Sequence, residues 1–273
     1  MGTTLTTPEI DSLKAKLKAT WMSGDYDLFS RYMEQDARVF YEQLGVPTRC
    51  QLLDVACGSG QVALWAARDG VFVSGVDIAP NLIQRAQARA KAENLHARFV
   101  EGDAEDLPFE DASFDVVTSL FGAMFAPRPE RVARELLRVC SPGGTIAMGN
   151  WTAEGFIGQM FKTFAKFIAP SGMAAPVLWG NEGVVRERLG HGVSDLKMTR
   201  RHYTFTYPFP PIDVVEFFRQ YYGPTNRAFA SLDENDARKL RNELEALWST
   251  HNRGGDDLTV VEAEYLEVIA VRV

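Results

Sequence analysis

Two glycines that follow an apolar run are the first residues of the chain that suggest ligand chemistry. In the segment LLDVACGSGQVALWAA, Gly58 and Gly60 stand between a predicted strand and a predicted helix. Glycines in that place let the chain turn tightly and let a ligand approach the backbone. The spacing Gly58-x-Gly60-x-x-Ala63 also satisfies a dinucleotide-binding pattern, and Asp77 ends the next predicted strand, where a carboxylate would hold a ribose. The loop alone therefore leaves a nicotinamide or flavin enzyme open.

Asp54, four residues before Gly58, separates these possibilities. A carboxylate there would face the anionic pyrophosphate of a dinucleotide at short range, which costs free energy. It suits a ligand with a cationic amino group, reached directly or through water. S-adenosylmethionine carries such an ammonium group and no phosphate. Asp54 therefore favours adenosylmethionine over a dinucleotide.

A second acidic segment, GDAEDLPF at residues 102–109, follows the third predicted strand. The Asp103 carboxylate can accept a hydrogen bond from the exocyclic amine of adenine, and the backbone of Ala104 can donate one to the ring. Each feature also has a structural explanation. The two glycines could serve only a turn, Asp77 could cap the helix that begins near Pro80, and Asp103 could be an ordinary loop carboxylate. One ligand explains all the placements together, and we favour that interpretation.

Short apolar runs alternate with amphipathic segments and predict the elements that position these residues. Repeated strand–helix–strand units form a parallel sheet with helices on both faces. After Trp151 the rhythm changes to mostly helical segments, with two further strands near 197–207 and at 264–273. The predicted early strands cover residues 51–56, 71–77, 97–103, 114–120 and 144–151, and the helices between them cover 61–68, 81–92 and 129–139.

The predicted organisation is a single domain over residues 1–273. Its cap would cover the carboxyl edge of the sheet, where open α/β sheets bind ligands. The expected parts are an N-terminal helical lid at 1–46, a cofactor-binding core at 47–151, a helical and aromatic acceptor cap at 152–257 that includes the strand at about 197–207, and a terminal strand of the sheet at 258–273.

With these motifs in place, the chain resembles the class I S-adenosylmethionine-dependent methyltransferases of the small-molecule type, the ubiquinone/menaquinone-biosynthesis-like methyltransferase type 11 group. The matching segments are LLDVACGSG, GVDIAP, EGDAEDLPFEDASFDVV and ELLRVCSPGGTIAMGNW, over about residues 51–151. The resemblance implies an α/β fold with a Rossmann-like, seven-stranded, mostly parallel sheet, an antiparallel last strand and helical cap insertions. One departure is SLFGAMFAP at residues 119–127, which replaces a usually polar segment and argues against a quinone-precursor acceptor.

The resemblance also implies roles for the cofactor residues. S-adenosylmethionine would be the methyl donor and S-adenosylhomocysteine the product, with no metal. Apart from the resemblance, the position of Tyr26 in the turn Gly24-Asp25-Tyr26 suggests that it closes over the cofactor from the N-terminal side. By the resemblance, Asp54, Ala56, Gly58 and Gly60 would line the methionine moiety, Asp77 would bind both ribose hydroxyls, Ile78 would pack on adenine, Asp103 and Ala104 would recognise the adenine edge, and Ser119 would lie under the sulfonium.

The acceptor side carries no comparable motif. Methyl transfer from a sulfonium is an in-line displacement, so alignment and exclusion of water can supply much of the catalysis, and only some acceptors need a base. His202 and Tyr203 are weak candidates for that base, and as neighbours on a strand they would point to opposite faces. Half of the chain's aromatic residues lie between residues 150 and 230, which suits a small apolar or aromatic acceptor methylated at O, N, S or C. The candidate substrate-binding residues are Asn150, Trp151, Trp179 and Tyr221.

Composition restricts the partners and the compartment. The net charge of −7 and the absence of a basic block disfavour nucleic acid as a partner. The sequence contains no stretch of 18 uncharged apolar residues, which disfavours a membrane-spanning segment. Three widely spaced cysteines fit a reducing, cytoplasmic location. Lys14, Lys16 and Lys18 are expected on a solvated helix face. The oligomeric state stays open.

The leading hypothesis is therefore an adenosylmethionine-dependent methyltransferase for a small-molecule acceptor. Two alternatives stay open at this stage. A non-catalytic adenosylmethionine-binding regulatory protein would explain the missing base, and an NAD-dependent oxidoreductase would explain the pattern Gly58-x-Gly60-x-x-Ala63.

Overall fold

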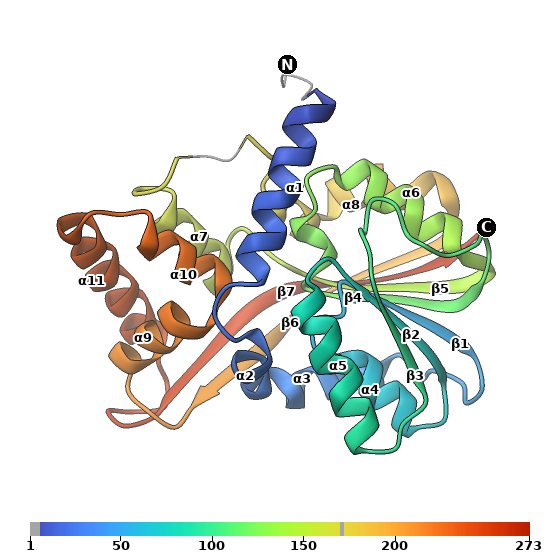
Figure 1. Cartoon of the computed structure of the whole chain (residues 1–273), viewed down its shortest axis with the longest axis horizontal. Helices are drawn as coiled ribbons and strands as arrows, with labels where there is room; N and C mark the ends of the chain where they lie inside the picture. The colour runs from blue at the N-terminus through green and yellow to red at the C-terminus, as the bar shows by residue number, and fades with distance from the viewer. Residues whose placement is uncertain (1–5, 170–171) are drawn as a thin grey trace.

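A single twisted sheet of seven strands runs through the computed structural model, which describes residues 6–169 and 172–273 (Figure 1). The strand order is β3-β2-β1-β4-β5-β7-β6. Strands β1 to β5 are parallel, and β7 is antiparallel to both of its neighbours, as predicted. The strands are β1 (Gln51–Val55), β2 (Phe72–Asp77), β3 (Ala97–Glu101), β4 (Phe114–Leu120), β5 (Cys140–Trp151), β6 (Val193–Tyr207) and β7 (Thr259–Arg272).

The central strands explain where a ligand can enter. In β1 every residue after Gln51 is buried, because parallel strands in the middle of a sheet are covered on both faces. From β1 the chain moves outward to β2 and β3, and then returns to the other side of β1 with β4. The loops after β1 and β4 therefore leave the sheet in opposite directions and open a crevice between them.

Helices cover both faces of this sheet. On one face α4 (Gln61–Arg68) and α5 (Pro80–Ala92) pack on the strands, with α3 (Glu34–Gln43) against α4. On the other face lie α6 (Pro129–Val139) and α8 (Glu182–Leu189). In α6 the buried residues Val132, Ala133, Leu136 and Val139 recur at helical spacing, which is why this segment folds as an amphipathic helix. None of the helices in the described ranges combines the length and apolar character needed to cross a bilayer.

The strand expected at 197–207 belongs to the sheet and not to the cap. As β6 it begins four residues earlier, at Val193, and pairs with β7 over nearly its whole length. Its second half alternates buried Tyr203, Phe205 and Tyr207 with more exposed residues, as a strand packed on one face requires. The terminal strand begins at Thr259, earlier than the strand expected at 264–273 but close to the boundary of 258 predicted for this part of the chain.

The cap is a cluster of four helices on one side of the sheet (Figure 1). Its centre is aromatic, with Trp248 at 4.5 Å from Phe156 and 5.2 Å from Phe218 between ring centroids. The helices are α7 (Phe156–Phe164), α9 (Pro211–Tyr221), α10 (Gly223–Ala230) and α11 (Glu234–His251). Of these, α10 was not predicted; it begins with Gly223 and Pro224, residue types that usually mark turns.

The N-terminal segment closes over the crevice and joins the cap. Its helices are α1 (Thr7–Trp21) and α2 (Tyr26–Ser30), followed by α3. The backbone N–H of Asp25 donates to the carbonyl of Tyr221 at 3.1 Å. A Cβ atom at Gly24 would lie 2.5 Å from that same carbonyl oxygen, and φ is +73° there, so only glycine fits. The first five residues of the lid predicted at 1–46 lie outside the described residues.

Candidate functional site

A cavity of about 1050 Å³, its open mouth included, lies where the loops after β1, β2, β3 and β4 meet the N-terminal helices. It lies in the crevice that the strand order predicts. Of the predicted cofactor residues, Tyr26, Asp54, Ala56, Gly58, Asp77, Ile78, Asp103 and Ala104 line this cavity.

The glycine loop has a left-handed backbone at three places. Ala56, Gly58 and Gly60 have φ of +56°, +55° and +90°. Gly58 lines the cavity, whereas Gly60 is the N-cap of α4 and faces the core. A Cβ atom at Gly60 would lie 3.1 Å from Leu64 and 3.4 Å from Phe99. Gly60 therefore shapes the start of the helix and does not line the predicted methionine site.

Asp54 is a buried carboxylate beneath the loop. Its Oδ1 accepts a hydrogen bond from the Thr118 hydroxyl and its Oδ2 from the Ala63 N–H, both at 3.1 Å. Burial, with a smaller contribution from Asp77, raises its pKa to about 7, and no positive charge contributes to its surroundings in the described part of the chain. A buried carboxylate without a counter-ion fits the ammonium group of adenosylmethionine.

Asp77 holds two turns together at the end of β2. Its Oδ2 accepts from the N–H of Gly58 at 2.9 Å and its Oδ1 from that of Ala79 at 2.8 Å. The contact with Ala79, the N-cap of α5, forms a turn that leads into the helix, but Asp77 is not the cap of α5, whose N-cap makes no side-chain hydrogen bond. Each carboxylate oxygen keeps a second lone pair, so the ribose hydroxyls can still be accepted. Burial raises the pKa of Asp77.

Asp103 is engaged by the N-terminal helix. Its Oδ1 accepts from the N–H of Glu105 at 2.9 Å, and its Oδ2 pairs with the Lys14 ammonium group. Lys14 also pairs with Glu105 at 2.6 Å; the Glu105 side chain is fully buried and pairs with Arg128 as well. Lys14 is thus no solvated lysine, contrary to the expectation for this helix face, because the ends of β3 and its loop are acidic and lie under α1.

We expect Lys14→Met to loosen α1 over the cavity. The change removes the cation shared by Asp103 and Glu105, and hydrogen bonds to charged groups contribute about 1.5–3 kcal/mol. Amide exchange in α1, followed by mass spectrometry, should accelerate about tenfold. Lys16→Met is the matched control, because Lys16 is exposed on the same helix and its side chain has no ion pair in the described structure. Equal acceleration in both variants would contradict this role of Lys14.

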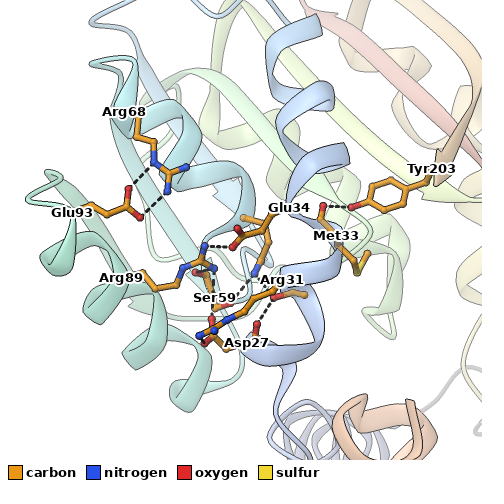
Figure 2. A network of polar contacts seen from close by, with 11 residues as sticks. Asp27, Arg31, Met33, Glu34, Ser59, Arg68, Arg89, Glu93 and Tyr203 are labelled. Carbon is orange, nitrogen blue, oxygen red and sulfur yellow. Dashed lines mark hydrogen bonds and ion pairs between the residues drawn. The ribbon is translucent and has the colours of Figure 1, made fainter. Parts of the chain in front are cut away.

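A second polar network holds α2 and α3 against the core (Figure 2). Arg89 of α5 contacts Asp27 at 3.6 Å, pairs with Glu34, and donates to the carbonyl of Ser59 at 3.3 Å. Gln61 donates to the hydroxyls of Ser30 at 2.6 Å and Ser59 at 2.7 Å. The glycine loop is therefore tied directly to the lid.

Tyr26 lies where this lid meets the glycine loop. A Cβ atom at Gly58 would be 3.3 Å from the Tyr26 ring. The ring therefore borders the cavity from the N-terminal side, where the sequence places it.

Ser119 and the four predicted substrate residues lie outside the cavity wall. The Ser119 hydroxyl donates to the carbonyl of Val55 at 2.9 Å and accepts from the N–H of Ala123 at 3.1 Å, so it fastens β4 to β1. Asn150 is buried in β5, and Tyr221 is in α9. Trp151 is covered by Phe121, and Trp179 stacks on Arg188 at 4.6 Å.

The two candidate bases lie on opposite sides of β6. His202 is exposed and borders a second cavity with Asp36 and Arg200. Tyr203 lines the main cavity, but its hydroxyl donates to the carbonyl of Met33 (Figure 2). Burial raises its pKa well above the ordinary value. A phenol whose proton is already donated and held this firmly is poorly suited to be a base at neutral pH.

Sequence reasoning missed the apolar part of the cavity. Trp21 of α1 and Phe121, Phe125 and Pro127 after β4 line it. From the sequence, we used the segment SLFGAMFAP only as an argument against a quinone-precursor acceptor and did not predict that it lines the cavity. Its apolar character was the available signal for this wall.

Comparison with known proteins shows which family the chain is related to. The family model of the methyltransferase domain matches residues 53–148. An uncharacterised protein of Mycobacterium tuberculosis is 38% identical over 275 residues, 98% of each chain. The demethylmenaquinone methyltransferase of Thermus thermophilus is 31% identical over 170 residues, 59% of this chain and 76% of that protein. Phosphoethanolamine N-methyltransferase 2 of Haemonchus contortus, solved with S-adenosylhomocysteine, has the same fold at a TM-score of 0.57 and 20% identity, over 87% of this chain and 52% of that chain.

The fold and the cavity together define a Rossmann-like methyltransferase. The chain belongs to the class I S-adenosylmethionine-dependent methyltransferase family, whose cofactor is S-adenosylmethionine. This assignment gives no support to the NAD-dependent oxidoreductase alternative.

Proposed function

We propose that the protein transfers a methyl group from S-adenosylmethionine to a small apolar or aromatic acceptor by in-line displacement. The observation that carries the proposal is the composition of one cavity. Three carboxylates, Asp54, Asp77 and Asp103, line it together with an uncharged aromatic wall. The carboxylates match the ammonium, ribose and adenine groups of the donor, and the wall matches an apolar acceptor.

The residues would share the work as follows. When bound, the cofactor supplies an electrophilic methyl group on a sulfonium, a good leaving group. Asp54 would hold the ammonium, Asp77 the ribose hydroxyls, and Asp103 with Ala104 the adenine edge. The lid residues Trp21 and Tyr26 would exclude water, so that alignment inside a closed site supplies most of the rate acceleration.

The test is formation of S-adenosylhomocysteine from S-adenosylmethionine with a panel of small acceptors that includes phenols, amines, thiols and carbon acids. We expect product with at least one uncharged acceptor. Binding of the cofactor without product on the whole panel would favour the alternative, a non-catalytic regulatory protein. That alternative is motivated by the lack of an evident base among the described residues that line the cavity.

The pH dependence of cofactor affinity should report on Asp54. Its pKa of about 7 lies above the ordinary 3.8, so the carboxylate that attracts the ammonium forms only as the pH rises through 7. Affinity for S-adenosylhomocysteine should therefore fall toward about tenfold per pH unit below 7 and level off above it. Asp54→Asn should bind weakly with a flat profile between about pH 5.5 and 8. An unchanged profile in that variant would contradict the role of Asp54.

The same group affects stability in the opposite direction. Because its pKa is higher in the folded apo-protein than in the unfolded chain, the folded state holds the proton more firmly between about pH 4 and 7. The contribution of Asp54 to the free energy of unfolding is therefore greatest at low pH and declines as the pH rises to about 7.

A further inference from the structure

The segment after β4 forms an apolar wall of the cavity. From Leu120 to Pro127 every residue except Met124 lines the cavity, and none has a polar side chain. The carboxylates of the lining belong instead to β1, β2 and the loop after β3. Residues 120–127 therefore contribute an uncharged wall to the cavity.

Phe121 is held on this wall in an unusual conformation. Its φ is +60°, a region that residues other than glycine rarely adopt. The N–H of Phe121 donates to the carbonyl of Gly149 at 2.9 Å. The next residue, Gly122, is packed against Ala56 so closely that a Cβ atom would lie 2.5 Å from the Ala56 Cβ. The surroundings thus fix the direction of the Phe121 side chain, and such fixed, unfavourable backbone often marks a functional position.

An aromatic block supports Phe121 from behind. We give this name to Phe121, Trp151, Tyr203 and Tyr265. Phe121 stacks on Trp151 at 3.6 Å between centroids and 7° between planes, and meets Tyr203 and Tyr265 edge to face at 5.2 and 5.4 Å. Of these four residues only Phe121 and Tyr203 line the cavity. The Tyr203 hydroxyl is occupied by its hydrogen bond to the Met33 carbonyl. Tyr203 and Phe121 therefore both present the carbon atoms of their rings to the cavity.

A second aromatic pair borders the same cavity from the lid side. Trp21 and Phe125 pack edge to face at 5.1 Å. Trp21 also contacts Tyr26 at 5.7 Å, so its ring is fixed by neighbours as well. The uncharged part of the cavity is therefore bounded by rings whose orientations are set before any ligand binds.

We propose that the methyl acceptor is an uncharged, planar aromatic ring and that Phe121 selects it by ring-to-ring contact. This inference rests on the proposed function. Rings held in fixed orientations favour a flat partner, because aromatic pairs are stabilised beyond the apolar area they bury. A charged acceptor would lose its hydration here without finding an opposite charge. Phe121 is thus a specificity-determining residue, and Trp151 acts through it.

The test compares two probes on the protein saturated with S-adenosylhomocysteine. 2-Naphthol is planar, and decahydro-2-naphthol has the same carbon skeleton and hydroxyl group but is puckered. Equilibrium dialysis should show 2-naphthol bound about three- to tenfold more tightly, the factor that an aromatic contact contributes. A cavity that responds only to apolar area would bind the saturated probe at least as well.

Two variants locate the preference. Phe121→Leu should abolish it when both probes are measured on the variant saturated with S-adenosylhomocysteine. Phe205→Leu is the matched control, because Phe205 is buried 5.9 Å from Trp151 and 5.5 Å from Tyr203 but does not line the cavity. It should keep the preference. No preference in the parent protein, or an equal loss in both variants, would overturn the inference. Failure of the parent protein to bind S-adenosylhomocysteine would instead contradict the proposed function, and this inference with it.

Discussion

Replacing Asp77 by alanine is expected to weaken the binding of S-adenosylhomocysteine about 100-fold. The ribose hydroxyls of the ligand would lose two charge-assisted hydrogen bonds to the carboxylate, which together contribute about 3 kcal/mol to binding. The buried N–H groups of Gly58 and Ala79 would also lose their acceptor, which disturbs the glycine loop. Isothermal titration calorimetry measures the change directly.

The same variant separates the binding role of Asp77 from a purely structural one. If Asp77 only capped the turn before α5, Asp77→Ala would lower the melting temperature and leave the affinity of the folded protein unchanged. Asp77→Asn keeps one acceptor oxygen and should show an intermediate affinity. Unchanged affinity in both variants, measured below their melting temperatures, would remove Asp77 from the proposed site.

Gly122→Ala should be strongly destabilising. Gly122 has an ordinary backbone conformation, with φ of −99°, so the effect is purely steric. The new Cβ atom would lie 2.5 Å from the Ala56 Cβ and 2.6 Å from the Ala56 carbonyl oxygen, in the loop that lines the cavity. Overpacking of this kind costs about 1–3 kcal/mol, and roughly 2–4 °C of melting temperature for each kcal/mol. Affinity for S-adenosylhomocysteine should fall as well, because Ala56 must move.

Gly190→Ala is the control for this prediction. Gly190 also has helical φ and ψ, and a Cβ atom there would lie 3.8 Å from its nearest neighbour, Arg186. Its melting temperature should stay within a degree or rise slightly, since alanine restricts the unfolded chain. Equal stability of the two variants would show that the loop can yield at Ala56, and the rigid packing of Phe121 would then have no support.

The donor half of the site could be predicted from the sequence because local patterns determine it. Apolar runs locate β1 to β5, and the three carboxylates lie at or just past the ends of these strands: Asp54 is the last but one residue of β1, Asp77 is the last residue of β2, and Asp103 comes two residues after β3. Asp54, Asp77 and Asp103 therefore had to meet at one edge of a parallel sheet. Gly60 and Ser119 were predicted to contact the cofactor but do not line the cavity. The position of a residue in a motif does not say whether it faces the ligand or the core.

The lid over the cavity and the acceptor half of the site both depend on contacts between distant segments. Lys14 meets Asp103 across 89 positions of sequence, and no local pattern couples the two. Trp151 was predicted to bind the substrate because it is an aromatic residue at the carboxyl end of β5. Phe121 stacks on Trp151 and lines the cavity instead of it. The left-handed backbone of Phe121 that makes this possible has no sequence signal, because the residue is not a glycine.

The central claim, that the cavity binds S-adenosylmethionine, is tested most directly by calorimetric titration of the full chain with S-adenosylhomocysteine and, separately, with NADH. We expect saturable binding of S-adenosylhomocysteine at one site per chain, stronger above pH 7 than below it, and no binding of NADH. Absence of S-adenosylhomocysteine binding, or saturable binding of NADH, would contradict it.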